Sequence, residues 1–564
     1  MSAKENTFDA IVIGSGMSGG WAAKELAEKG LKTLVLERGR DVKHNVDYPT
    51  TNMKPWEFEH QNQIPIDLKK ENPIISKCYA FNEDAQHFFV KDKEHPYVQE
   101  KPFDWIRGYQ VGGKSLMWAR QTQRWSDHDF TGPARDGFAV DWPIRYSDID
   151  PWYSYVEKFV GISGNKDGLS ELPDGEFLPP MQMTKVESYF QEKVASQYKD
   201  RHIIIGRCAH ITEVKPIFTE QGRAKCQHRN ICQRGCPFGG YYSSNSSTIP
   251  WALRTGNMTL RPHSVVHSLI YDEQKGKATG VRVIDAETNQ SSEYFAKIIF
   301  VNAGALNTNL ILLNSTSTRF PQGLGNDNGL LGKFVAFHNY RARVNATYEG
   351  FENFTKYGNR PNSCYIPRFR NVRKQETGFL RGYAAGFDGS RTVERSTEGM
   401  GTDLKNNLLN PTLGLWHVGS HMMGETIPKE SNFVALDPTL KDAWGIPQLK
   451  ISVDYDENDE KMVADYIEQL SDMFNKAGFK DIKSNDSHKA PGLDIHEMGG
   501  VRMGLDPKTS LLNKWNQLHA CKNVFVTDGA CMTSTSTQNP SLTYMAMTAR
   551  AADYAVKQLN KKEL

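Results

Sequence analysis

At 564 residues the chain is too long to fold around one hydrophobic core, so we expect at least two large domains. Its 68 Lys and Arg residues nearly balance 66 Asp and Glu residues, for a formal net charge of +2. This balance gives no support for binding to nucleic acid or to an anionic membrane surface. No apolar run approaches the roughly 18 residues of a membrane span. The first residues lack the apolar core of a signal peptide, so we expect no export signal in the chain itself.

The first predicted unit is a βαβ motif at the N-terminus. An apolar strand ends at Ile13, Gly14-Ser-Gly-Met-Ser-Gly19 follows, and a helix and a second strand end at Glu37. In such a motif Gly14 permits the tight turn, Gly16 lets the backbone approach a pyrophosphate, and Gly19 allows close packing of helix on strand. A glycine turn of purely structural origin is the alternative. The strand before it, and Glu37 placed to accept hydrogen bonds from ribose hydroxyls, favour a dinucleotide site.

Two further turns have the residue types of a cofactor site. Gly112 and Gly113 are followed by Ser115, which suggests a loop pressed against a flat cofactor, although a glycine turn between strands explains the pattern equally well. A predicted strand over 296–302 ends in Ala303 and Gly304 and opens a helix, again a place for backbone contacts to a dinucleotide.

The C-terminal region carries residues suited to alcohol oxidation. A strand ends in Asp528-Gly529, and His496 and Asn539 lie on either side of it in the sequence. An imidazole can remove a hydroxyl proton, and an amide can hold the oxygen while a hydride leaves.

Three of the eight cysteines, Cys226, Cys232 and Cys236, lie close together, and a proline follows the last. Disulfides are not expected in a chain without a signal peptide. Clustered thiolates ending in Cys-Pro are typical of iron–sulfur ligation, whereas zinc would need a fourth ligand such as His228 or Cys208. A loop of reduced thiols remains the third interpretation, and spacing alone does not decide among them.

The region 336–489 has a different pattern. Aromatic-interleaved strands over 340–348 and 448–455 precede a helix over 458–477. This order predicts an antiparallel sheet with a helix on one face, covering a small-molecule pocket. Two more helices are predicted, over 146–160 and 187–198.

Taken in order, these motifs resemble those of the glucose–methanol–choline (GMC) oxidoreductases over nearly the whole chain. The resemblance implies an α/β fold, with a Rossmann-type FAD-binding domain and an α+β substrate domain containing an antiparallel sheet, as in pyranose oxidases. The expected FAD-binding domain comprises 1–45, 101–125, 205–335 and 490–564. Residues 46–100 form an excursion, and 126–204 with 336–489 form the substrate-binding domain.

The same resemblance implies roles for individual residues. His496 matches the catalytic histidine and Asn539 its partner, Glu37 the ribose ligand, and Asp528 the residue near the pyrophosphate and ribityl chain. Val266 matches a strand valine whose backbone meets the adenine. The other expected cofactor-binding residues are Gly14, Gly16, Gly19, Gly112, Gly113, Ser115, Ala303, Gly304 and Gly529.

Two departures from the simple oxidases carry expectations of their own. Met117 stands where the covalently flavinylated members have a linking histidine, which implies non-covalent FAD. The cysteine segment resembles that of three-subunit bacterial sugar dehydrogenases, including glucoside 3-dehydrogenases, although its first spacing is one residue longer. That resemblance implies a [3Fe-4S] cluster on Cys226, Cys232 and Cys236, a small signal-bearing subunit and a cytochrome c subunit. The chain would then fold in the cytoplasm and be exported with its partner; otherwise it would stay cytoplasmic.

We therefore expect an FAD-dependent dehydrogenase that oxidises a secondary hydroxyl of a sugar or glycoside to a ketone. His496 would be the base, the hydride would go to flavin N5, and electrons would pass to a cytochrome or another acceptor. An oxidase using O₂ is the alternative within enzymes. A non-catalytic electron-transfer flavoprotein is the alternative of another class, and it gives no reason for a base beside the cofactor.

Overall fold

The computed structural model describes residues 6–354 and 360–564, and the first of its two large sheets has a Rossmann-like centre. Parallel strands run β7 (Met258–Arg261), β2 (Thr33–Leu36), β1 (Thr7–Ile13), β10 (Ser291–Val301), and β19 (Val524–Val526) pairs with β10. Strands β9 (Lys277–Asp285) and β8 (Ser264–Asp272) extend β10 as an antiparallel meander. The central strands are buried on both faces, as parallel strands covered by helices must be.

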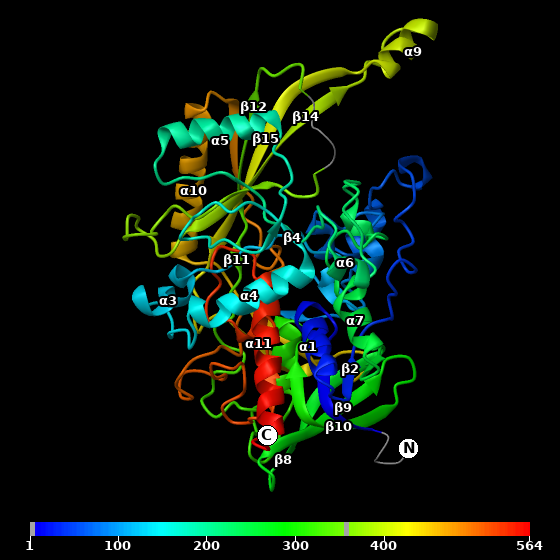
Figure 1. Ribbon diagram of the computed structural model, residues 1–564, viewed down its shortest axis with the longest axis vertical. Coiled ribbons are helices and arrows are strands. Elements are labelled where there is room, and N and C mark those ends of the chain that lie inside the picture. Colours follow the sequence, from blue (N-terminus) through cyan, green and yellow to red (C-terminus); the bar gives the residue numbers. More distant parts are fainter. Residues whose placement is uncertain (1–5, 355–359) are drawn as a thin grey trace.

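Helices of small residues cover this sheet. Helix α1 (Met17–Glu28) follows β1 and packs on α11 (Ser541–Asn560), and the two lie side by side in Figure 1. Ala23 and Ala27 belong to the same buried cluster as Ala551 and Ala555, so the two helix axes can approach closely. Helices α7 (Thr248–Arg254) and α8 (Ala305–Leu313) complete the cover.

The second large sheet is antiparallel, as predicted. Its order is β18 (Lys480–Asp486), β12 (Ala342–Tyr348), β15 (Thr412–Glu425), β14 (Tyr383–Glu394), β13 (Cys364–Ile366) and β6 (Ile204–Ile205), with β11 (His338–Asn339) paired to β15. Helices α10 (Glu457–Lys476) and α5 (Lys185–Gln197) pack against it (Figure 1). Met462, Tyr466, Leu470 and Met473 recur at helical spacing and form the buried stripe of α10.

One strand predicted for this sheet belongs elsewhere. Strand β17 (Pro447–Ser452) pairs with β16 (Phe433–Lys441) and with the short β3 (Val98–Gln99) in a separate three-stranded sheet. Its Leu449 and Ile451 are buried in one cluster with Phe103 and Leu306. Leu306 lies on helix α8, which packs against the first sheet. The sequence pattern over 448–455 correctly predicted a strand but carried no information about its partner.

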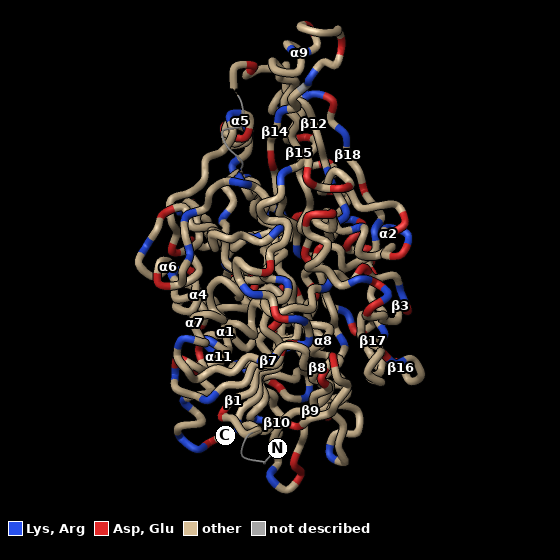
Figure 2. The backbone as a smooth tube through the Cα atoms, turned by 90° about the vertical axis from the view of Figure 1, so that its right-hand side faces the viewer, with Lys and Arg blue, Asp and Glu red and all other residues tan. Residues whose placement is uncertain are grey.

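The remaining elements are short or lie in connections. They are α2 (Ile66–Glu71), α3 (Asp127–Arg135), α4 (Tyr146–Val160), α6 (Pro216–Glu220), α9 (Gly401–Leu409), β4 (Ile162–Ser163), β5 (Phe177–Leu178), and the 3₁₀ turns η1 (Pro55–Glu57), η2 (Ile75–Lys77), η3 (Gln86–Phe88), η4 (Gly113–Leu116), η5 (Cys232–Arg234), η6 (Ser244–Ser246) and η7 (Gly529–Cys531). Basic and acidic residues are interspersed along the backbone (Figure 2). Within the described ranges no helix combines the length and apolar character needed to cross a bilayer.

Candidate active site

The turn after β1 is built by close backbone contacts. Gly14 has φ +92°, and a Cβ there would lie 2.3 Å from the carbonyl oxygen of Asn302, in the turn after β10. A Cβ on Gly19 would lie 2.0 Å from the carbonyl oxygen of Gly14. Gly14 and Gly16 line a large cavity, whereas Gly19 lies behind the turn and lets α1 pack on it.

Glu37 lies at the end of β2 on the wall of the same cavity. Its Oε2 accepts hydrogen bonds from Ser15 N at 3.1 Å and Ser15 Oγ at 2.5 Å, and its Oε1 accepts one from Gly39 N at 3.0 Å. Burial raises the pKa of this carboxyl, while these hydrogen bonds oppose that effect. Glu37 therefore braces the first turn and still presents acceptor oxygens to the cavity.

The predicted glycine-rich loop lies across from this turn. Gly112 has φ +89° and its N–H donates to Ser15 Oγ at 2.9 Å. Ser115 is fully buried; its Oγ donates to the carbonyl oxygen of Gly112 at 2.6 Å and accepts from Ser244 N at 3.0 Å. Gly113 is on the cavity wall, so Gly112 and Ser115 shape the loop from behind.

Asp528 ties two of the predicted turns together. Its Oδ2 accepts from Gly304 N at 2.9 Å and Thr308 Oγ1 at 2.6 Å, both after β10, and its Oδ1 accepts from Ala530 N at 3.0 Å. Burial raises its pKa to about 6. Because β10 and β19 are adjacent and parallel, their carboxyl ends meet at the sheet edge where nucleotides bind in such folds.

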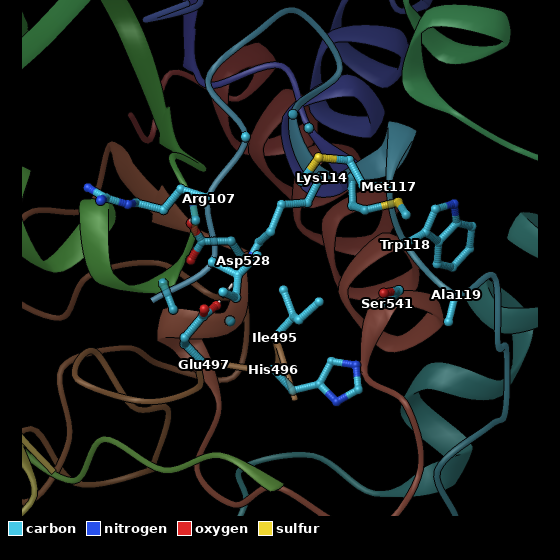
Figure 3. A pocket seen from close by; sticks show the side chains of 18 of the residues that line it. Arg107, Lys114, Met117, Trp118, Ala119, Ile495, His496, Glu497, Asp528 and Ser541 are labelled. Atoms are coloured by element: carbon cyan, nitrogen blue, oxygen red, sulfur yellow. Dashed lines mark hydrogen bonds and ion pairs between the residues drawn. The ribbon is translucent and has the colours of Figure 1, made fainter. Parts of the chain in front are cut away.

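A lysine that sequence reasoning did not single out lies beside Asp528. Lys114 Nζ is 2.7 Å from Glu497 Oε2, and Figure 3 shows its side chain reaching from the glycine-rich loop towards Asp528. Lys114 lies between Gly113 and Ser115 in the sequence and Glu497 directly follows His496, and only the fold brings the two together. They place one cation and one anion at the middle of the cavity.

The cavity has a volume of about 680 Å³ and extends from the first sheet to the second. Of the expected cofactor residues, those on its wall are Gly14, Gly16, Glu37, Gly113, Val266, Ala303, Gly304, Asp528 and Gly529. Asn302 Nδ2, Glu497 Oε1 and Tyr544 Oη are buried there and have no hydrogen-bond partner within the part of the chain that the structure describes. Such buried orphan groups suit a polar ligand, and the backbone cradle and volume fit a dinucleotide.

The structure brings His496 and Asn539 together on the same wall. His496 Nε2 is 3.3 Å from Asn539 Nδ2, and His496 Nδ1 is 2.9 Å from Nδ1 of a second histidine, His338. Burial lowers the pKa of His496 well below its usual value, and positive charge on His338 or Lys114 would lower it further. In Figure 3 the imidazole lies across the cavity from Met117, which comes from the glycine-rich loop. No sequence motif pointed to His338.

The far end of the cavity is polar and is formed by the second sheet and its loops. Tyr340, Ser363 and His421 line it together with Arg120 and Asn362. Arg120 Nε and Asn362 Nδ2 are buried donors that have no acceptor among residues 6–354 and 360–564. This wall is therefore suited to a ligand that carries several hydrogen-bond acceptors.

Cys226, Cys232 and Cys236 line a second, smaller cavity. Cys232 Sγ is 3.8 Å from His210 Nε2. Burial and the two neighbouring cysteines raise the pKa of Cys226 to about 12. Asn230 lines both cavities, so the three thiols adjoin the large cavity without entering it.

Fold and site together define an oxidoreductase with a dinucleotide cofactor. Models of the GMC oxidoreductase family match residues 8–333 and 428–548. The chain is 27% identical to a 2-methyl-1,2-propanediol dehydrogenase of Mycolicibacterium austroafricanum (99% of this chain, 97% of the relative). It is 25% identical to a fructose dehydrogenase large subunit of Gluconobacter japonicus (100% of both) and 23% to a gluconate 2-dehydrogenase flavoprotein of Pantoea cypripedii (96% and 92%).

Among solved structures, a formate oxidase of Aspergillus oryzae RIB40 superposes with a TM-score of 0.61 at 13% identity, covering 99% of each chain. The chain belongs to the GMC oxidoreductase family. It is an FAD-dependent oxidoreductase acting on CH–OH donors, and the predicted fold class is confirmed.

Asp494 gives a pH-dependent prediction. Its Oδ2 accepts from His338 N at 2.7 Å, its Oδ1 has no partner among the described residues, and burial raises its pKa to about 7. As the pH rises from about 4 to about 7, the unfolded chain loses the Asp494 proton whereas the folded protein keeps it. The contribution of Asp494 to the free energy of unfolding therefore falls by about 1.4 kcal/mol for each unit of pH increase. We expect Asp494→Asn to remove this contribution from the slope of the free energy of unfolding against pH. The measurement is urea unfolding at pH 4.5, 5.5 and 6.5.

Asp67, whose side chain is 92% exposed, provides the control as Asp67→Asn. Equal slopes in wild type and Asp494→Asn would contradict the prediction.

Proposed function

We propose that this protein is a dehydrogenase that oxidises a secondary hydroxyl of a sugar or glycoside to a ketone and passes the electrons to a cytochrome or another acceptor. The observation that carries the proposal is the contact of 3.3 Å between His496 and Asn539 on the wall of the FAD cavity. A base and an amide at that distance can share one substrate oxygen.

The cofactor's position follows from the walls described above. We propose that Gly14, Gly16 and Gly113 form the backbone surface that receives the pyrophosphate, with Gly16 N–H as a donor, because Gly14 N and Gly113 N already donate to backbone carbonyls. Glu37 would bind the adenosine ribose, and the backbone of Val266 would meet the adenine. Ala303, Gly304, Asp528 and Gly529 would hold the middle of the cofactor, with Gly19, Gly112 and Ser115 shaping its turns. We retain the expected division: FAD-binding domain 1–45, 101–125, 205–335 and 490–564, excursion 46–100, and substrate domain 126–204 with 336–489.

The protein's own part of the reaction is positioning and proton transfer. The substrate hydroxyl would lie between His496 Nε2 and Asn539 Nδ2, so that the imidazole takes its proton while the amide N–H holds its oxygen. Because burial keeps the pKa of His496 well below 6.5, the imidazole is neutral and able to accept at neutral pH. FAD, when bound, supplies the hydride acceptor.

The polar end of the cavity supports a sugar or glycoside as the substrate. Arg120 Nε and Asn362 Nδ2 are donors there that no described residue accepts from, which suits a polyhydroxylated molecule better than a simple alcohol. The names of two relatives, fructose dehydrogenase and gluconate 2-dehydrogenase, support the same class. An O₂-using oxidase is the alternative that the fold similarity to formate oxidase favours, and oxygen consumption against dye reduction separates the two.

We expect His496→Ala to lower the rate of flavin reduction by roughly 10²- to 10⁴-fold, because a positioned base contributes about that factor. FAD content should be unchanged. The measurement is anaerobic stopped-flow reduction at saturating sugar, and His519→Ala, which removes a histidine bonded to Ser510, is the matched control. Reduction within a few-fold of wild type would remove His496 from the mechanism.

We also propose that the FAD is non-covalent, since Met117 lines the cavity where a linking histidine would be needed. Precipitation with acid should therefore release all yellow colour into the supernatant as intact FAD, as checked by chromatography. Colour that stays with the pellet would refute this.

The second cavity supports a [3Fe-4S] cluster on Cys226, Cys232 and Cys236, because three thiols face one small space and this cluster type needs three protein ligands. Its place beside the large cavity suits passage of single electrons out of the flavin site. We propose with it a small signal-bearing subunit and a cytochrome c subunit, and export of the folded chain with the former. Two relatives, a fructose dehydrogenase large subunit and a gluconate 2-dehydrogenase flavoprotein, have names of the kind given to components of such assemblies.

Cys232→Ser is expected to remove iron and acid-labile sulfide from anaerobically purified protein, together with the EPR signal of the oxidised cluster. Cys521→Ser, at a buried cysteine that contacts Asn523, should leave all three unchanged. Stoichiometric FAD without iron in active wild-type protein would overturn the cluster and favour a single-subunit enzyme with free thiols.

A further inference from the structure

We propose that His338 is a positioning residue that fixes His496 in the tautomer whose Nε2 is unprotonated and available to the substrate hydroxyl. The inference rests on the proposed function, because it explains which nitrogen of His496 acts there as the base.

His338 lies on β11, and its side chain is completely buried beside His496. The two rings are nearly perpendicular, at 83°, with their Nδ1 atoms 2.9 Å apart. The other nitrogen of His338, Nε2, is 3.1 Å from the carbonyl oxygen of Thr535. The three groups form a chain that ends at a backbone carbonyl.

The proton positions follow from the ends of this chain. A carbonyl oxygen only accepts, so His338 Nε2 must carry the proton. A neutral His338 then has a bare Nδ1, which accepts from His496 Nδ1–H. Neutral His496 is left with a bare Nε2, the atom that lies 3.3 Å from the Asn539 amide in the cavity.

These proton positions require both imidazole rings to be neutral near neutral pH. Burial lowers the pKa of His338 to about 4 and that of His496 well below its usual value. A second proton on His338 would place N–H groups on both facing nitrogens unless His496 reversed its tautomer, which would occupy the atom needed by the substrate.

A bound metal is the competing explanation for such a cluster. In the described part of the chain, donor atoms of His338, Asp494 and His496 lie within 4.8 Å of one another. A metal would sit about 2.0–2.1 Å from each nitrogen, with an open angle between them, and would hold the two nitrogens more than 2.9 Å apart. Asp494 Oδ2 accepts from His338 N at 2.7 Å, which leaves only Oδ1 as a possible metal ligand. The contact is therefore that of a hydrogen bond.

The acceptor at the end of the chain is held in place. Thr535 Oγ1 donates to the carbonyl oxygen of Thr426 at 3.3 Å, and Ser536 Oγ donates to Asp129 Oδ1 at 2.7 Å. Thr426 Oγ1 also accepts from Phe337 N at 3.1 Å, next to His338. Strand β11 and the 535–536 segment are thus fixed to each other through Thr426, so His338 cannot reverse its ring without losing the Thr535 bond.

The test compares His338→Asn with His338→Leu in the FAD-loaded protein. Asparagine places a carbonyl oxygen near the position of Nδ1, where it can accept from His496, whereas leucine fills the space without an acceptor. We expect flavin reduction within about tenfold of wild type for His338→Asn and at least about 100-fold slower for His338→Leu, since a wrong tautomer has cost up to about 10⁴-fold in serine proteases. Substrate Kd, FAD content and melting temperature should stay close to wild type in both.

Nitrogen-15 NMR of histidine-labelled holoenzyme reads the tautomer directly, with the His496 signals assigned by their loss in His496→Ala. We expect a protonated Nδ1 and a bare Nε2 on His496 in wild type and in His338→Asn, and a mixture in His338→Leu. A bare Nδ1 in wild type, or equal rates in the two variants, would overturn the inference. If no sugar reduces the wild-type flavin, the proposed function fails, while the NMR result still decides the tautomer.

Discussion

The structure depends on the meeting of three strand ends at one edge of the first sheet. Strands β1, β10 and β19 are parallel neighbours, so the turns that follow them converge. Gly14 lies against the carbonyl of Asn302, where a side chain would clash, and the Asp528 carboxylate accepts from Gly304 N across the gap. The backbone N–H groups of these turns can face one elongated ligand only because the turns touch one another.

This arrangement separates the residues that bind the cofactor from the residues that act on the substrate. The cofactor residues come from turns of the first sheet, while His496 receives its neighbour His338 from β11 of the second. The reactive pair therefore lies where the two sheets meet, at the end of the cavity that also carries Arg120 and Asn362. A substrate held by the second sheet is brought to a cofactor held by the first, which is the requirement for hydride transfer.

Burial determines the chemistry of the ionisable groups at this junction. It lowers the pKa of both histidines and raises that of Asp494 to about 7, so each group favours its neutral form. A neutral imidazole can accept a proton. A neutral carboxyl group nearby adds no repulsion to the negative charge that develops on the substrate oxygen. Lys114 on the cavity wall is paired with Glu497, at 2.7 Å.

The sequence by itself determined the elements that local rules specify. Gly14, Gly16 and Gly19 after an apolar strand predicted the first βαβ unit, because only glycine permits those backbone conformations and contacts. His496 and Asn539 were predicted from their residue types beside a strand ending in Asp-Gly. The 3.6-residue period also predicted α10 to within one residue at each end.

Tertiary structure decided the features that depend on which segments meet. The sheet that β17 joins was predicted wrongly, because alternation fixes which faces of a strand are buried and not its partner. Nothing local distinguishes His338 from a core histidine; its contact with His496 spans 158 positions and lies next to the antiparallel bridge between Ala336 and Met498. Ser115 was expected at the cofactor but supports its loop from behind, because the 3₁₀ turn η4 points its hydroxyl towards Gly112 and Ser244. Sequence patterns record the chemistry of a residue and its immediate backbone, whereas distances between remote side chains exist only after the chain has packed.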